Sequence, residues 1–185
     1  MPVSQVTRRP LYVASDARLD ESAPPSLAVL IYDPEDRSRT GFCSVLPVAL
    51  RQRWSVQQQY IALVELAAPV TAVFWCKKQF KNRDIVWFID NSAALSCLVK
   101  GGSSSEDMDR GTSAVHLALA EMRARVWWEY VESKANWSDT ASRLLFLDPW
   151  CLANSFSLDP FKVPEWVWFV EPHQLLGAVK QTFDP

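Results

Sequence analysis

The sequence predicts an α/β protein in which helices flank a five-stranded mixed sheet whose first three strands are antiparallel. Three short apolar runs separated by turn residues open the chain, and apolar runs then alternate with helical patterns. Hairpins that lead into α/β crossovers build a mixed sheet covered by helices. Hydrophobic residues make up 49% of the 185 residues, which is enough for a substantial core.

The strands are predicted from apolar runs that end at turn formers or at an acid. The first runs over 11–15 and ends before Asp16, and the next two cover 26–32 and 41–46. The fourth, DIVWFI at 84–89, is apolar enough to be buried on both faces and ends before Asp90. The fifth covers 126–131.

Four helices are predicted from apolar spacing. The longest covers 55–80 with Ser55 as its N-cap, and Pro69 should kink or interrupt it because proline lacks a backbone donor. A short helix at 92–100 should stop at Gly101. The other two are expected at 106–123 and from 136 to 145.

A change of composition near Phe146 predicts the domain organisation. Residues 1–10 are an N-terminal arm, 11–146 form the α/β domain, and 147–185 are an extension rich in proline and aromatic residues. We expect the extension to pack against the domain, the alternative being a docking surface for another chain.

Charge and hydropathy limit the classes of function. Charged residues make up 22% of the chain and the net charge is −2. These values exclude a strongly basic protein that coats nucleic acids and a disordered acidic protein. The weak net charge also argues mildly against any nucleic-acid partner, because phosphate binding usually needs basic residues. The N-terminus lacks the apolar core of a secretion signal, and the apolar stretch 60–76 is interrupted by Glu65 and Pro69. We therefore expect an intracellular protein, cytoplasmic or nuclear, without membrane contact; the sequence defines no oligomeric state.

Four acids occupy informative positions. Asp16 and Asp90 follow the first and fourth strands, so neighbouring strands would place both at one edge of the sheet. Glu65 is the only charged residue in its stretch of apolar helix, and a buried carboxylate needs a compensating charge. Asp139 lies in the first turn of the last helix.

Divalent cations would relieve the repulsion within such a cluster, since Mg²⁺ prefers oxygen ligands and two ions can share carboxylates. Each acid also has a structural alternative. Asp16 would be a turn former, Asp90 a helix N-cap, and Asp139 an acid favoured by a helix dipole. Glu65 would pair with a basic side chain.

Several motifs in the right order resemble the ribonuclease H domain of reverse-transcriptase retroelements, within the ribonuclease H-like superfamily. The resemblance covers 11–146, nearly three-quarters of the chain. It is carried by S-D-A at 15–17, Y-I-A-L-V-E-L-A-A at 60–68, F-I-D-N-S-A-A-L at 88–95, G-G-S-S-S at 101–105 and W-W-E-Y-V-E-S-K-A-N-W-S-D-T-A-S-R at 127–143.

The resemblance implies an endonuclease that uses two Mg²⁺ or Mn²⁺ ions to cleave the RNA strand of an RNA–DNA hybrid, leaving a 5′-phosphate. Its catalytic and metal-binding acids fall on Asp16, Glu65, Asp90 and Asp139. Candidate substrate contacts are Asn91, Ser92, Asn136, Lys77, Lys78 and Lys81. The histidine that cellular members carry before the last acid is absent from 131–137.

An adjoining reverse-transcriptase polymerase domain is a further partner implied by the resemblance, and it would account for the weak charge of this chain. Two alternatives stay open. One is an inactive domain that serves as a scaffold or binding module. The other is a DNA-cutting nuclease of the same fold, because a fold alone does not define a substrate.

Overall fold

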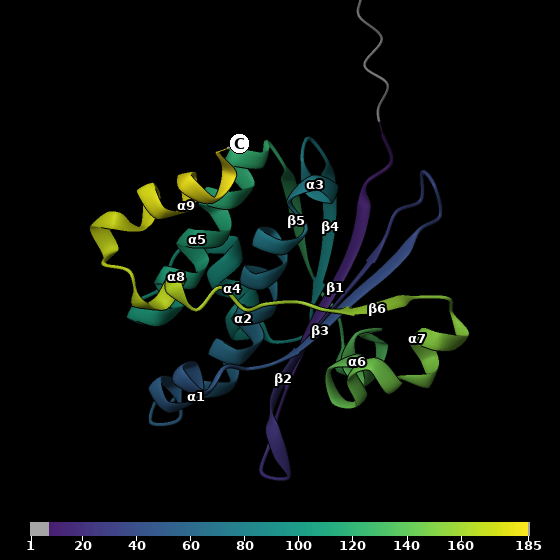
Figure 1. The fold of residues 1–185 in the computed structure, drawn as a ribbon, viewed down its shortest axis with the longest axis horizontal. Coiled ribbons are helices and arrows are strands. Elements are labelled where there is room, and N and C mark those ends of the chain that lie inside the picture. The colour runs from purple at the N-terminus through teal and green to yellow at the C-terminus, as the bar shows by residue number, and fades with distance from the viewer. Residues whose placement is uncertain (1–7, 185) are drawn as a thin grey trace, which may run out of the picture.

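One six-stranded mixed sheet organises the chain in the computed structural model, which describes residues 8–184 (Figure 1). The strands lie in the order β5–β4–β1–β2–β3–β6. Their bounds are β1 Leu11–Asp20, β2 Ala23–Tyr32, β3 Arg39–Val45, β4 Asp84–Ile89, β5 Arg125–Tyr130 and β6 Ser157–Pro160. The first three pair antiparallel, β4 and β5 continue parallel from β1, and β6 pairs parallel to β3. The predicted mixed sheet is confirmed, with one strand more than expected.

Helices cover both faces of the sheet. On one face lie α2, α4 and α5 with α8 and α9 outside them, and on the other lie α6 and α7 (Figure 1). The helix bounds are α1 Val48–Trp54, α2 Tyr60–Trp75, α3 Lys77–Phe80, α4 Ser92–Lys100, α5 Glu106–Met122, α6 Asp139–Leu144, α7 Pro149–Ala153, α8 Trp166–Phe169 and α9 Leu175–Phe183. Single 3₁₀ turns occupy Ser133–Ala135, Leu145–Leu147 and Pro172–Gln174.

The main core lies between the sheet and the helices α2 and α5. Val13, Leu27 and Trp87 of the sheet are completely buried there. Gly111 lets α5 approach α2 closely, because a Cβ at this position would lie 2.8 Å from Leu66 Cδ2. The result is a rigid support beneath α2, the helix that carries Glu65.

The single helix predicted over 55–80 is wrong. α1 ends at Trp54 with Ser55 as its C-cap, α2 begins only at Tyr60, and α3 follows as a separate turn. Pro69 does not interrupt α2. Every side chain from 62 to 73 is buried, so tertiary packing outweighs the lost backbone hydrogen bond.

Two other boundaries differ from the prediction. β1 runs on to Asp20, so Asp16 lies within the strand and is no turn former. The last predicted helix starts at Asp139 instead of 136, because the Asn136 side chain accepts hydrogen bonds from the Ser138 backbone and hydroxyl. This places Asn136 in the loop before α6.

Residues after Phe146 join the fold. They supply β6, and they bury Val167 and Trp168 in the main core, where the Trp168 ring meets Trp54 edge-on with centroids 4.9 Å apart. The boundary at Phe146 stays a prediction. Of the predicted arm at 1–10, all but residues 8–10 lie outside the described part of the chain. No helix within 8–184 is both long and apolar enough to cross a membrane.

Candidate metal centre

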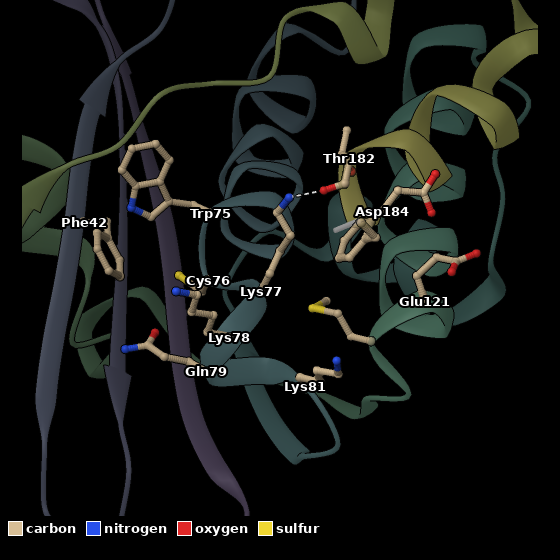
Figure 2. Close-up of a pocket in the computed structure, with 12 residues that line it drawn as sticks. Phe42, Trp75, Cys76, Lys77, Lys78, Gln79, Lys81, Glu121, Thr182 and Asp184 are labelled. Carbon is tan, nitrogen blue, oxygen red and sulfur yellow. Dashed lines mark hydrogen bonds between the residues drawn. The ribbon is translucent and has the colours of Figure 1, made fainter.

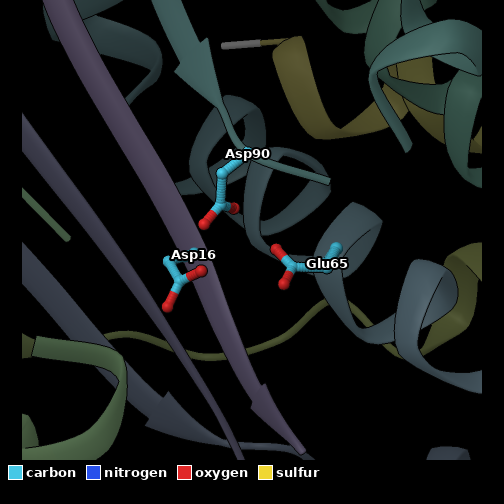
Figure 3. A group of neighbouring side chains, drawn as sticks. All are labelled: Asp16, Glu65 and Asp90. Atoms are coloured by element: carbon cyan, nitrogen blue, oxygen red, sulfur yellow. The ribbon is translucent and has the colours of Figure 1, made fainter. Parts of the chain in front are cut away.

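Asp16 of β1, Glu65 of α2 and Asp90, directly after β4, form a compact cluster of carboxylates (Figure 3). One carboxylate oxygen from each residue lies within 4.8 Å of those of the other two. Asp16 and Asp90, which are more than seventy positions apart in the sequence, are thus brought close together. This is a geometry that a single divalent ion can bridge.

The sheet leaves room for the three carboxylates because β4 ends before β1 does. β4 ends at Ile89, while β1 continues to Asp20, so the side of β1 next to β4 is open beyond Ser15. The backbone of Ala17 at this opening lowers the pKa of both the Asp16 and the Glu65 carboxyl groups against the effect of burial. Glu65 therefore reaches the strand from a helix packed on one face.

Burial and mutual repulsion raise the pKa values of this cluster. Asp16 and Glu65 are 3% and 7% exposed. Burial is the main cause that raises the pKa of Asp16 to about 7, and the charges of Asp90 and Asp139 add to it. The pKa of Glu65 is raised well above its ordinary value by burial and then by Asp16 and Asp90. The site therefore resists holding all its negative charges at neutral pH without a cation.

Ser142 of α6 is a contact that the sequence analysis missed. Its hydroxyl oxygen lies 2.5 Å from Asp16 Oδ2, and this hydrogen bond lowers the pKa of Asp16 against the effect of burial. Ser142 stands three residues after Asp139, on the same face of a helix. That spacing was visible in the sequence, although the distant partner in β1 was not.

No basic side chain neutralises the cluster. None of the ion pairs among residues 8–184 includes Asp16, Glu65 or Asp90, so the alternative of a basic partner for Glu65 is not realised within this range. Asp90 Oδ1 is buried and has no hydrogen-bond partner among these residues. Asp90 is also no N-cap, because the Asn91 side chain caps α4 by accepting from Ala93 and Ala94.

The donor set fits a hard divalent cation. Three carboxylates supply oxygen ligands of the kind that Mg²⁺ and Mn²⁺ bind, and the unpartnered Asp90 Oδ1 is the atom that most needs a ligand. A buried polar atom left unpaired is costly, so the arrangement is explained by an ion more readily than by packing.

Asp139 stands beside the cluster without belonging to it. It lies in the first turn of α6, and its charge raises the pKa of both Asp16 and Glu65. Its Oδ1, however, is 2.9 Å from Arg143 Nη2 in an i,i+4 ion pair. The structure therefore brings three of the four predicted acids together and leaves the fourth adjacent, paired with a base.

The candidate substrate contacts fall into a near group and a far group. Asn91 and Ser92 open α4 directly after Asp90, while Asn136 is buried, with its Nδ2 donating to the Ser15 carbonyl next to Asp16. Asn136 thus supports the backbone of the site.

Lys77, Lys78 and Lys81 lie at the opposite end of α2. Glu65 and Trp75 are ten residues apart, roughly 15 Å along the helix axis. The three lysines instead line a cavity of about 530 Å³ between α3 and α9, in which Lys77 Nζ donates to the Thr182 carbonyl (Figure 2). They are not neighbours of the carboxylates.

Comparison with known proteins defines the fold. No protein-family model and no curated protein matches the sequence. The structure is similar to ribonuclease H1 of the halophilic archaeon Halobacterium salinarum NRC-1, with a TM-score of 0.51 and 12% identity over 69% of this chain and 89% of that one. An N-terminal RNase H domain from Mycobacterium tuberculosis, solved as a fusion with maltose-binding protein, matches with a TM-score of 0.48 and 10% identity over 68% of this chain and 84% of that one. The match to the archaeal protein shows that the fold is ribonuclease H-like, with flanking helices around a mixed sheet.

Proposed function

We propose that this chain is a metal-dependent endonuclease that hydrolyses the RNA strand of an RNA–DNA hybrid. The observation that carries the proposal is the cluster of Asp16, Glu65 and Asp90, buried and without a basic partner among residues 8–184. It lies at the carboxyl end of β4 in a ribonuclease H-like sheet, where open α/β sheets commonly place their sites.

The proposed catalytic residues are Asp16, Glu65, Asp90 and Asp139, which would hold two Mg²⁺ or Mn²⁺ ions. When bound, such ions lower the pKa of a coordinated water and stabilise charge on a phosphoryl oxygen. Asp139 would need to leave Arg143 to take part. The hydrogen bond from the Ser142 hydroxyl would keep the Asp16 carboxylate in place.

Substrate recognition would rest on the shape of the hybrid, its 2′-hydroxyls and its phosphates. Asn91 and Ser92 are the proposed contacts nearest the scissile bond, because they directly follow Asp90 at the start of α4. The lysines of α3 would at most contact phosphates farther along the duplex.

We further propose a retroelement origin and an intracellular location, with 11–146 as the catalytic domain. A net charge of −2 gives little attraction for a polyanion, so an adjoining reverse-transcriptase polymerase domain would supply much of the affinity. This part of the proposal rests on the motifs in the sequence.

Cleavage of matched substrates tests the proposal. The full chain is incubated with Mg²⁺ or Mn²⁺ and a labelled RNA–DNA hybrid, duplex DNA, duplex RNA or single-stranded RNA. We expect cleavage of the hybrid RNA strand alone, abolished by Asp90→Asn and retained by Asp84→Asn, the same substitution at the exposed opposite end of β4. Cutting of duplex DNA would identify a DNA nuclease of this fold, and inactivity in every arm would indicate a scaffold.

A further inference from the structure

A pocket beside Asp139 is built partly by the C-terminal extension. Its volume is about 310 Å³, and it lies between the loop after β5, the start of α6 and the start of α7. Its lining comprises Ser133, Lys134, Ala135, Asn136, Trp137, Asp139, Thr140 and Trp150. One wall therefore carries a proposed catalytic acid, and the other carries a tryptophan from outside the predicted domain.

A buried carboxylate fixes the two walls relative to each other. Asp148 is completely buried and accepts a 2.9 Å hydrogen bond from the backbone N–H of Trp150, the first turn of α7. It also accepts a 3.2 Å hydrogen bond from the hydroxyl of Thr140, the residue after Asp139. The position of Trp150 is thereby tied to the helix turn that holds Asp139.

Aromatic packing braces the Trp150 ring and leaves part of it open. Trp150 stacks on Phe156 with ring centroids 5.8 Å apart, and Phe156 packs in turn against Trp137 at 6.0 Å. Trp137 meets Phe88 of the sheet. The side chain of Trp150 nevertheless remains 41% exposed. A supported, solvent-facing indole is a surface on which a flat ring can stack.

The charges around the pocket suit a nucleotide. Lys134 is exposed and forms no ion pair with any residue from 8 to 184. The acid on the opposite wall, Asp139, is offset by Arg143. A phosphate can thus approach Lys134 while its base reaches Trp150.

Resting on the proposed function, we propose that this pocket binds one unpaired nucleotide of the nucleic-acid substrate, with the base stacked on Trp150 and the phosphate beside Lys134. Bases within a duplex are stacked on their neighbours and present no free face, whereas an unpaired base can stack on an aromatic side chain. Substrates with a single-stranded nucleotide near the cleavage site would therefore be preferred over blunt hybrids.

Binding of a short single-stranded RNA tests the pocket separately from catalysis. Fluorescence anisotropy of a labelled oligonucleotide of about eight nucleotides is measured on the full chain in EDTA, which prevents cleavage. We expect Trp150→Ala to weaken binding roughly tenfold and Trp150→Phe to retain most of it. Lys134→Glu should also weaken binding. It should reduce the slope of log affinity against log salt concentration by about one.

Trp127→Ala and Lys180→Glu are the matched controls, because both side chains are exposed on other elements, β5 and α9. Their binding should equal that of the wild type. Unchanged affinity in Trp150→Ala, equal losses in Trp127→Ala, or no binding by the wild type would each overturn the inference. If the chain cleaves the hybrid but binds RNA independently of Trp150, the nucleotide-pocket proposal is wrong and the nuclease proposal stands. If binding depends on Trp150 but no hybrid is cleaved, the nuclease proposal is wrong and the pocket proposal stands.

Discussion

Asp16 and Asp90 stand at the same level of two neighbouring parallel strands. The register places Ala14 opposite Phe88, and extending it by two residues places Asp16 opposite Asp90. Side chains at one level of parallel strands point to the same face, so the backbone itself holds these carboxylates together. The sheet thereby imposes a repulsion that only a cation or a proton can relieve.

Asp90→Asn should make the metal-free protein more stable and abolish its stabilisation by Mg²⁺. Removing one negative charge relieves Asp16 and Glu65, whose pKa values Asp90 raises. We expect the unfolding free energy in EDTA to rise by about 1 kcal/mol, since one pKa unit corresponds to about 1.4 kcal/mol. Urea denaturation with EDTA and with Mg²⁺ measures both effects. Asp84→Asn should keep the response to Mg²⁺, and a metal response retained in Asp90→Asn would contradict the assignment.

The stability of the metal-free protein should depend on pH through Asp16. Its pKa rises from 3.8 to about 7 on folding, so the folded state holds a proton that the unfolded chain releases. This contribution is fully present below pH 3.8 and is lost as the pH rises through about 7. The slope is at most about 1.4 kcal/mol per pH unit.

Asp33 and Asp107, whose pKa values are lowered, act in the opposite direction, so the raw profile mixes signs. Subtracting the urea-denaturation profile of Asp16→Asn from that of the wild type, both in EDTA, gives the contribution of Asp16 together with the part of the Glu65 shift that Asp16 causes, which has the same sign. A difference that stays constant between pH 4 and pH 7, to about half a kcal/mol, would show that Asp16 titrates normally.

Ser142→Ala should move metal binding to higher pH. The lost hydroxyl hydrogen bond favours the charged form of Asp16, so the pKa of Asp16 rises further without it. Titration with Mn²⁺ at several pH values should show a higher midpoint pH for binding. Ser26→Ala is the matched control, because Ser26 Oγ is also buried and donates at 2.5 Å, but to the Ser142 carbonyl. An equal shift in both variants would mean that general loosening causes it.

Local sequence pattern predicted the positions of Asp16, Glu65 and Asp90 well because each acid interrupts or ends an apolar run. A lone charge in a buried helix is visible without knowledge of the fold. The sequence also predicted that Asp16 and Asp90 would lie at one edge of the sheet if their strands were neighbours, whereas their register came from the structure. The pairing of Asp139 with Arg143 was equally local, at i,i+4, but nothing in the sequence decides between that base and a metal.

The elements that the sequence missed depend on distant contacts. β6 has four residues, ends in Pro160, and forms only because β3 offers it a parallel edge. The break between α1 and α2 is favoured by Asp107 of α5, which accepts hydrogen bonds from Arg53, Trp54 and Gln57 around the turn. Periodicity within 55–80 contains no sign of that partner.

Asp107→Asn should destabilise the fold without changing the metal site. Burial raises the pKa of Asp107, but hydrogen bonds from Arg53 and Gln57 outweigh it, and the net pKa is lowered. Loss of the charge leaves Arg53 without its partner and should cost about 3 kcal/mol of unfolding free energy. Asp109→Asn, exposed in the same helix, is the control in urea denaturation. Equal stability of both variants would show that the α1–α5 contact contributes little.

Arg143→Gln should improve metal binding if Asp139 is the fourth ligand. Arg143 and a cation compete for the same carboxylate, because Asp139 Oδ1 receives hydrogen bonds from both Nη2 and Nε of Arg143. The pair is largely exposed, so its loss should cost no more than about 1 kcal/mol of stability. The Mg²⁺ concentration for half-maximal hybrid cleavage should then fall a few-fold, and Asp139→Asn should raise it. If Arg143→Gln instead raises that concentration while Asp139→Asn leaves it unchanged, the ion pair itself is the functional unit, and Asp139 acts by positioning Arg143 near the substrate phosphates.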